Sequence, residues 1–280
     1  MKWAGGKRWL TARHSYLLPS AYKTYHEPFL GSGAVFFHLL PKRAFLSDAN
    51  AHLIDCYSAV KSDWKSVWRY LLAMKYSHSE EFYYQTRDDK FRSRARQAAR
   101  FIYLNRTCFN GIYRENLKGV FNVPKGTKEG VVFPDDDFRS VSVALQNASL
   151  RAADFSKSIE KAERGDFLFV DPPYTVRHNN NGFVKYNQKI FSWADQIRLR
   201  DCIKSASRRG VKCLITNANH ASIQELYRDL GEFIAVSRNS LIAGSRDLRG
   251  TGNYHWICRR RFGGTTCFPV RAARSLKVAL

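Results

Sequence analysis

Four consecutive residues, Asp171-Pro172-Pro173-Tyr174, combine groups that could activate an amino group on a planar base. They follow the apolar run Phe167-Leu168-Phe169-Val170, which predicts a buried strand of a parallel sheet, and such sheets bind ligands outside the carboxyl ends of their strands. The Asp171 carboxylate and the Pro172 carbonyl could accept the two amine hydrogens and localise the nitrogen lone pair while Tyr174 stacks on the base. This set suits methylation of the exocyclic nitrogen of adenine. The alternative is a strand that ends in a Pro-Pro turn, with Asp171 as a cap.

A second candidate site is Gly31-Ser32-Gly33, between a predicted strand and a predicted helix. Glycines let the backbone turn tightly and approach a ligand closely, as in nucleotide-binding turns. The third glycine of the dinucleotide fingerprint is missing, so the turn alone is a weak signal. Asp48 ends the next predicted strand and could accept hydrogen bonds from both ribose hydroxyls of a nucleoside. Its alternative role is to cap a helix from residue 49 onward.

The first residues contain an aromatic ring and a cation, Trp3 and Lys7, on either side of Ala4-Gly5-Gly6. Two glycines between such side chains allow the backbone to fold over a small ligand. A frayed terminus fits the same residues equally well. Composition leaves both interpretations open.

The charge balance of the chain predicts a polyanionic partner. Its 280 residues carry a formal charge of +22, from 46 Lys+Arg against 24 Asp+Glu, which favours nucleic acid. The six cysteines contain no C-x-x-C pair, so we expect reduced thiols and neither a zinc site nor a disulfide framework. A signal peptide and a membrane-length apolar stretch are both absent from the sequence. These features predict a soluble, cytoplasmic protein.

The remaining pattern predicts an α/β sheet with a helical, basic insertion. Strands are expected at 24–29, 43–47, 151–155, 166–170 and 211–216, with a terminal pair at 233–237 and 254–259. Helices are expected at 34–40, 62–74, from 79, at 91–104, after 135–137, at 192–209 with Gly210 at its C′ position, and at 221–230 before Gly231. Residues 105–123 have the composition of a loop.

Three arginines of the insertion, Arg92, Arg96 and Arg100, recur every four residues and would lie on one helix face. Such a face could contact phosphates, which position a protein on nucleic acid without specifying its sequence. A solvated helix face is an equally good explanation for each arginine.

Six segments occur in one order over residues 2–260. They are residues 2–7 (KWAGGK), 27–33 (EPFLGSG), 47–50 (SDAN), 103–111 (YLNRTCFNG), 119–124 (GVFNVP) and 171–174 (DPPY). In order and spacing these segments resemble those of the Dam-type DNA adenine-N6 methyltransferases of the DPPY class, which use S-adenosylmethionine. No single segment is decisive, but the ordered set is specific.

The resemblance implies a Rossmann-like S-adenosylmethionine methyltransferase sheet with an inserted, mainly helical target-recognition domain that carries a β-hairpin. We therefore predict a catalytic domain at 1–56 and 141–261, a DNA-binding domain at 57–140 and a basic tail at 262–280. The implied catalytic residues are Asp171, Pro172 and Tyr174. The implied cofactor-binding residues are Trp3, Lys7, Phe29, Gly31, Gly33, Asp48 and Asp171. The implied DNA-binding residues are Arg92, Arg96, Phe109, Asn110, Ile112, Arg114, Asn116 and Asn122.

The implied activity is methyl transfer from S-adenosylmethionine to adenine N6 in duplex DNA, within GATC by similarity, with base flipping. Arg114 would read a guanine edge, for which its fork is well shaped, or would contact a phosphate instead. The resemblance also implies a metal-independent monomer at the nucleoid of a bacterial or phage-infected cell. Three rivals remain: an RNA or other amino-group methyltransferase, a catalytically degenerate DNA-binding relative, and a dinucleotide oxidoreductase.

Three features depart from the family pattern. Only two residues precede Trp3, where relatives have a longer lead. Residues 252–257 (GNYHWI) replace an acid-containing strand, which leaves the pairing of the last strand open. Lys125 follows Pro124 where relatives often carry an aromatic residue, so a contact near the DNA could differ.

Overall fold

A seven-stranded sheet organises the chain in the computed structural model, which describes residues 3, 5–111, 113–116, 119–176, 191–238 and 253–259. The strands are β1 (Tyr25–Glu27), β2 (Ala44–Asp48), β3 (Ala148–Ala152), β4 (Phe167–Val170), β5 (Lys212–Ala218), β6 (Glu232–Arg238) and β7 (Asn253–Arg259). Their order is β3-β2-β1-β4-β5-β7-β6. This is the doubly wound order 3-2-1-4-5-6 with β7 inserted, so the predicted Rossmann-like sheet is confirmed.

The first five strands of this order are parallel, and β7 is antiparallel to both of its neighbours, β5 and β6. The predicted terminal strand pair is therefore confirmed, and the open question of the last strand's partners is answered. The strand order reverses between β1 and β4. In open sheets of this kind, the crevice beyond the carboxyl ends of the strands at this switch point is where ligands bind.

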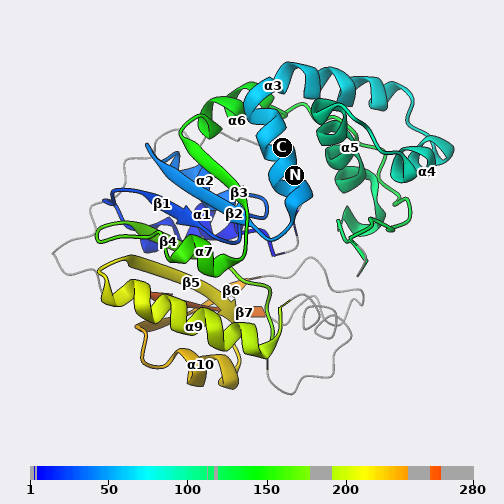
Figure 1. Cartoon of the computed structure of the whole chain (residues 1–280). Coiled ribbons are helices and arrows are strands. Elements are labelled where there is room, and N and C mark those ends of the chain that lie inside the picture. Colours follow the sequence, from blue (N-terminus) through cyan, green and yellow to red (C-terminus); the bar gives the residue numbers. More distant parts are fainter. Residues whose placement is uncertain are drawn as a thin grey trace.

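The helices are α1 (Arg8–Arg13), α2 (Ala34–Leu39), α3 (Ala51–Tyr76), α4 (Glu80–Asp88), α5 (Arg94–Thr107), α6 (Phe138–Leu145), α7 (Phe155–Ile159), α9 (Trp193–Arg208) and α10 (Ala221–Tyr227). Short 3-10 turns occupy Ser15–Leu17 and Phe109–Gly111. In Figure 1, α3, α4 and α5 extend to the upper right of the sheet, whereas α9 and α10 lie below it. No helix in the described part of the chain has the length and apolarity that crossing a membrane requires.

Strand β4 shows why its sequence is a continuous apolar run. Phe167 and Phe169 point into a core shared with α1, α2, α3 and α5. Leu168 and Val170 point into a second core shared with α7, α9 and α10. Successive side chains of a strand alternate between the two faces, and helices cover both faces here. All four side chains are consequently buried.

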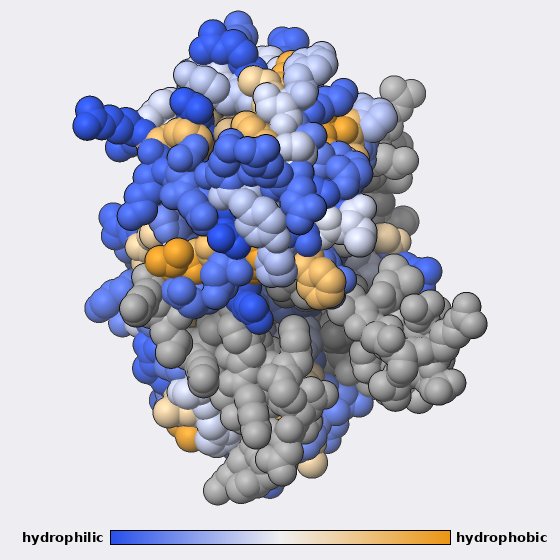
Figure 2. Space-filling model, turned by 90° about the vertical axis from the view of Figure 1, so that its right-hand side faces the viewer, coloured by the Kyte–Doolittle hydropathy of each residue, from blue (hydrophilic) through white to orange (hydrophobic). Residues whose placement is uncertain are grey.

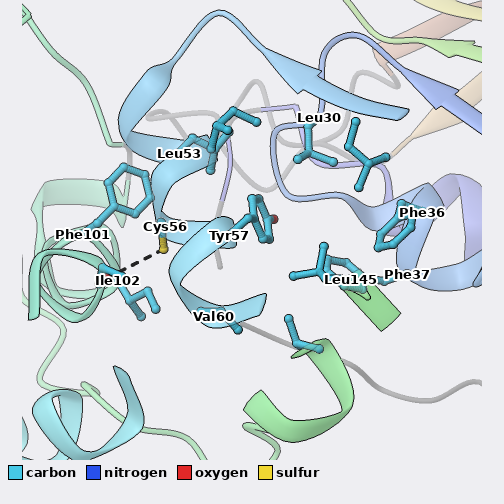
Figure 3. Close-up of a cluster of buried hydrophobic side chains, with 14 of the residues drawn as sticks. Leu30, Phe36, Phe37, Leu53, Cys56, Tyr57, Val60, Phe101, Ile102 and Leu145 are labelled. Atoms are coloured by element: carbon cyan, nitrogen blue, oxygen red, sulfur yellow. Dashed lines mark hydrogen bonds between the residues drawn. The ribbon is translucent and has the colours of Figure 1, made fainter. Parts of the chain in front are cut away.

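Helix α3 connects the sheet to the helical region at 80–107. Figure 3 shows Cys56 and Tyr57 of α3 between Phe36 and Phe37 of α2 on one side and Ile102 of α5 on the other. The helix begins after Asn50, whose side chain accepts a hydrogen bond from Leu53 N, and runs to residue 76 with a non-helical Asp63 inside it. It therefore crosses the predicted domain boundary at 56/57 without a break at that point. The division into domains stays a prediction.

Several predicted boundaries were wrong, and at one of them a side-chain cap explains the difference. The strand predicted at 151–155 lies at 148–152, since Asp154 caps α7 and Phe155 opens that helix. Residues 105–107 are helical and buried rather than a loop. Helix α10 ends at Tyr227, before the predicted end at 230.

Other predictions of helix ends are confirmed. Ser192 and Asp195 form a capping box at the start of α9, and Gly210, with φ of 87°, follows its end. Asp137 caps α6, as the run of three aspartates indicates.

The thiols of Cys56, Cys108, Cys202 and Cys213 are reduced, and all but Cys202 are buried. The predicted basic tail at 262–280 lies outside the described residues.

Candidate active site

The Asp171-Tyr174 segment leaves the carboxyl end of β4 at the switch point of the sheet. Asp171 Oδ2 lies 2.6 Å from Lys7 Nζ, and Asp171 Oδ1 accepts a hydrogen bond of 2.6 Å from Thr216 Oγ1 at the end of β5. The Asp171 side chain is 17% exposed and that of Lys7 3%. The carboxylate is thus held from both sides while part of it faces solvent. Thr216 was missed by the sequence analysis, which treated β5 only as a strand.

Lys7 joins the N-terminal segment to this site. It lies directly before α1, its ammonium also donates to Gly5 O, and Nζ lies 5.1 Å from the centroid of the Tyr174 ring. A cation at that distance from an aromatic ring is attracted by the ring quadrupole. Lys7 is therefore ordered and not frayed, and its assignment to cofactor binding stays a prediction. Met1, Lys2 and Ala4 lie outside the described residues.

The glycine turn after β1 approaches Trp3 so closely that its first glycine has no room for a side chain. Gly31 has φ of 47°, and a Cβ atom there would lie 2.7 Å from Trp3 Cδ1. Gly33 has φ of 63° and directly precedes α2. Tyr57 of α3 donates to Gly31 O at 3.1 Å, which ties the turn to the helix behind it. The predicted tight turn is present, and the ring of Trp3 lies on it.

Asp48 at the end of β2 also binds the glycine turn. Its Oδ2 accepts from Gly31 N and its Oδ1 from Asn50 N, both at 3.0 Å. Burial raises the pKa of this carboxyl group, although the backbone hydrogen bonds oppose the rise. The cap of α3 is Asn50, so the alternative role of Asp48 as the cap of that helix is not what the structure shows.

Glu27, which the sequence analysis did not single out, ends β1 beneath the same turn. It is buried, and Tyr25 donates a hydrogen bond of 2.8 Å to its Oε2. Burial raises its pKa well above the usual range, the Tyr25 hydrogen bond opposes the rise, and the charges of Asp171 and Asp48 add to it. The signal was available, because Glu27, Asp48 and Asp171 each stand at the carboxyl end of a strand. Carboxyl groups at the ends of three neighbouring strands gather here, and the raised pKa of Glu27 favours its neutral form.

Phe29 is half-buried and packs within the second core. Its ring lies 5.5 Å from that of Phe155 and 5.7 Å from that of Phe191, measured between centroids. These contacts hold the segment between β1 and the glycine turn. The assignment of Phe29 to cofactor binding stays a prediction.

The predicted DNA-binding segment contains a hairpin, formed by residues 113–116 and 119–123 in the described part of the chain. An antiparallel bridge joins Glu115 to Phe121, and Asn116 N donates to Val120 O at 2.9 Å. Arg114, Asn116 and Asn122 are exposed on one face of the hairpin. The register of the bridge places Arg114 opposite Asn122.

Phe109 and Asn110 precede the hairpin in a 3-10 turn. Phe109 is 55% exposed, and Asn110 has a left-handed backbone with φ of 56°. An exposed aromatic ring beside exposed amides and an arginine provides both stacking and hydrogen-bonding groups. Ile112 lies outside the described residues.

The arginine face predicted for α5 is wrong. Ser93 caps the helix, so Arg92 lies before its first residue. Arg100 is half-buried and donates to Thr86 O at 2.7 Å and to Arg87 O, and burial lowers its pKa. Arg96 is exposed, and its guanidinium lies 3.9 Å from the centroid of the Phe91 ring. Arg92 and Arg96 remain predicted phosphate contacts, whereas Arg100 has a structural role.

Figure 2 shows the side of the molecule that lies at the right in Figure 1, and its described surface is mainly hydrophilic with scattered hydrophobic residues. This polarity suits a surface that meets a hydrated polyanion. Among the described residues no three His, Cys, Asp or Glu side chains gather in a way that could hold a metal ion.

Comparisons with known proteins show the family of this chain. Residues 3–241 match the family described as D12 class N6 adenine-specific DNA methyltransferase. The chain is 38% identical over 238 residues to type II methyltransferase M1.LlaDCHI of Lactococcus lactis subsp. cremoris, covering 81% of this chain and 84% of that protein. It is 35% identical over 240 residues to type II methyltransferase M.MjaIII of Methanocaldococcus jannaschii, covering 78% and 83%.

A DNA adenine methylase of Serratia marcescens is 31% identical over 259 residues, which cover 89% of this chain and 93% of that protein. The family match extends across the glycine turn, the hairpin and the Asp171-Tyr174 segment in a single span. Together with the Rossmann-like sheet, this assigns the reaction class as methyl transfer to DNA adenine. The chain belongs to the D12 class of N6 adenine-specific DNA methyltransferases.

Proposed function

We propose that this enzyme binds S-adenosylmethionine in the crevice between β1 and β4 and methylates adenine N6 within GATC in duplex DNA after flipping the base. The observation that carries the proposal is the position of Asp171. It lies at the switch point, paired with Lys7 and Thr216, and Pro172 and Tyr174 follow it in the chain. Cofactor and base would therefore meet at one carboxylate.

The residues around the glycine turn fit such a cofactor. When bound, S-adenosylmethionine supplies an electrophilic methyl group on a sulfonium with a positive charge. Asp48 uses one hydrogen bond on each oxygen for backbone N–H groups, and its other lone pairs can accept from ribose hydroxyls. Asp48 and Asp171 provide negative charge that favours a cation. Trp3 supplies an aromatic surface over Gly31.

In this proposal Asp171 holds the substrate amine by a hydrogen bond and forms no covalent bond with it. A carboxylate offers about four lone-pair sites, of which Thr216 and Lys7 each engage one. A remaining site can accept one amine hydrogen while the Pro172 carbonyl accepts the other. The nitrogen lone pair is then withdrawn from the ring and directed out of its plane, and Tyr174 stacks on the base to hold this orientation.

The partial burial of the candidate catalytic carboxylate supports base flipping. Asp171 is only 17% exposed, and a base that leaves the duplex stack could approach its carboxylate more closely than a stacked one. Extrusion of the base costs a few kcal/mol, which stacking on Tyr174 and hydrogen bonding in the pocket offset. We assign Phe109 and Asn110 to contacts with the distorted base stack of the DNA, and Arg114 to a guanine edge. Asn116 and Asn122 are assigned to DNA groups next to that guanine. All five side chains lie on the exposed part of this segment.

The test is transfer of labelled methyl from S-adenosylmethionine to two unmethylated duplexes, one with GATC and one with its adenine moved. We expect label in the first alone, recovered as N6-methyladenine. Label in both duplexes would contradict the GATC assignment while leaving the reaction intact. Label in neither, with tight DNA binding, would indicate a degenerate binding protein, and preferential labelling of a matched RNA would change the substrate class.

A further inference from the structure

A set of four aromatic rings connects the glycine turn at residues 31–33 to the hairpin. Tyr113 stands at its centre, with ring centroids 4.3 Å from Phe101 of α5, 4.6 Å from Phe121 of the opposite hairpin strand and 6.4 Å from Trp3. Trp3 and Phe101 are themselves 6.3 Å apart. The planes of Tyr113 and Trp3 differ by 16° and those of Tyr113 and Phe121 by 28°. We call these four residues the aromatic stack.

One end of the aromatic stack lies on the glycine turn. The Trp3 ring is so close to Gly31 that a Cβ atom there would overlap it, and Gly31 is bound in turn by Asp48. In Figure 3, Phe101 projects from α5 toward α3, the helix whose Tyr57 binds Gly31 O. A ligand that moves the turn or Trp3 must therefore move or compress the ring of Tyr113. Packed interiors have little free volume to absorb such a shift.

The other end of the aromatic stack carries the DNA-facing residues. Tyr113 is half-buried and directly precedes the exposed Arg114, and buried Phe121 directly precedes the exposed Asn122. Strand geometry sends neighbouring side chains to opposite faces, so the rings of the stack support the face that carries Arg114 and Asn122. A shift of Tyr113 changes where Arg114 points.

A second contact ties the hairpin to the other cofactor element. His52 Nε2, in the first turn of α3 after Asp48, lies 3.9 Å from Glu115 Oε1. Burial, followed by the charge of Glu115, raises the pKa of the Tyr113 hydroxyl, so Tyr113 acts as a neutral ring. The base of the hairpin thus contacts segments that follow both β1 and β2.

We propose that Tyr113 is a positioning residue that couples cofactor occupancy to the DNA-reading state of the hairpin, so that each ligand strengthens binding of the other. The inference rests on the proposed function, because it takes the cofactor to bind at Gly31 and Asp48 and the DNA at Arg114. Coupling between two ligands is reciprocal, and it is a ratio of affinities that can be measured. The stack is a contiguous route, and only a measured coupling assigns it that role.

The experiment measures the affinity for S-adenosylhomocysteine, an unreactive product, by equilibrium dialysis, with and without a saturating duplex that the wild type methylates. We expect the wild-type affinity to rise by about fivefold or more when DNA is present. In Tyr113→Leu the ratio of the affinity with DNA to the affinity without DNA falls below about twofold. The affinity in the absence of DNA stays within about twofold of wild type. Tyr113→Phe keeps the ring and the wild-type ratio.

The matched control is Phe82→Leu, which removes an aromatic ring from α4 that packs on Tyr103 of α5 at 5.7 Å and lies outside the aromatic stack. It keeps the wild-type ratio. Thermal unfolding checks that each variant is folded, and if Tyr113→Leu fails, Phe121→Leu breaks the same stack and is held to the same criterion. A Tyr113→Leu ratio equal to that of wild type overturns the inference, as does a wild-type ratio of one. A wild type that methylates no duplex overturns the proposed function instead.

Discussion

The glycine turn at residues 31–33 and the hairpin are built in opposite ways. Gly31 N donates a hydrogen bond to Asp48, and Gly31 O accepts one from Tyr57; both partners belong to other elements. Leu30 N donates to Ser47 O at 2.9 Å. The hairpin is held by its own short ladder and by rings packed beneath it, while its outer face is exposed. A small ligand of fixed shape benefits from a rigid, buried frame. A protein surface that binds DNA needs polar groups that are accessible before binding.

The largest effect is expected on the buried side of this comparison, at Asp171. Asp171→Ala removes the acceptor of the amine hydrogen and should lower kcat by about 10³-fold or more, with DNA affinity within about twofold of wild type. Single-turnover methyl transfer and gel shift measure the two quantities. Asp201→Ala, which removes an exposed carboxylate on α9, is the control and should leave both unchanged. Residual turnover above about a tenth of wild type would show that Asp171 does not hold the substrate amine.

On the exposed side, Arg114→Ala should lose recognition of one base pair. A bidentate arginine contact to guanine contributes about 1–3 kcal/mol of discrimination, which corresponds to roughly 5–150-fold in kcat/KM. Steady-state rates on GATC and on duplexes with each base pair changed in turn measure the loss. Arg96→Ala is the matched control and should weaken binding to all duplexes alike, with a shallower salt dependence. An equal loss on every duplex for Arg114→Ala would indicate a phosphate contact.

Two glycines with left-handed backbones compare the regions directly. Gly31 has φ of 47° and a Cβ there would overlap Trp3, whereas Gly119 at the hairpin tip has φ of 72° and nothing within 4 Å. Gly31→Ala should weaken cofactor binding by about tenfold and lower the free energy of unfolding by about 1–3 kcal/mol. Gly119→Ala carries only the backbone strain, about 1 kcal/mol, and should leave cofactor affinity unchanged. Isothermal titration with S-adenosylhomocysteine and urea unfolding distinguish the two variants. Equal effects of the two substitutions on cofactor affinity would contradict the explanation that the close contact between Gly31 and Trp3 shapes the cofactor site.

The smallest effect is expected in the pH dependence of stability. The raised pKa of Glu27 means that its stabilising contribution is complete below its ordinary pKa of 4.5 and is lost as pH rises through the folded-state pKa. The free energy of unfolding of wild type minus that of Glu27→Gln should therefore fall between about pH 5 and about pH 8, by no more than about 1.4 kcal/mol per pH unit. Urea unfolding of both proteins measures it. A difference that stays constant or rises with pH would show that the buried carboxyl is ionised without cost.

The sequence predicted most where the determinants are local. The apolar run before Asp171 predicted a buried strand, and β4 is buried on both faces because helices cover both. Gly31 and Gly33 predicted a tight turn, and both have positive φ. Ser192, Asp137 and Gly210 predicted helix ends, because caps act within one turn of the helix. In each case the signal and the structure it specifies lie within a few residues.

Predictions failed where a partner distant in sequence decides the role. The spacing of Arg100 indicated a DNA-facing residue, but α4 supplies backbone carbonyls that bind its guanidinium. Glu27 gave no signal by its type alone, and its raised pKa depends on burial and on two carboxyl groups from other strands. Periodicity shows which residues share a face of a helix, and it does not show what the neighbouring element offers to them.

By itself the sequence determined the candidate catalytic groups, because Asp171, Pro172 and Tyr174 lie within four residues and their relative positions follow from the chain. It also determined the turn at 31–33 and the acid at the end of β2. Only the tertiary structure decided that Lys7 meets Asp171, that Thr216 holds the same carboxylate, and that Trp3 stacks on Tyr113. These contacts join segments that are far apart in the sequence, and strand order and helix packing bring them together. The contact between Asp171 and Thr216 depends on the sheet, because β4 and β5 are paired and place their carboxyl ends side by side.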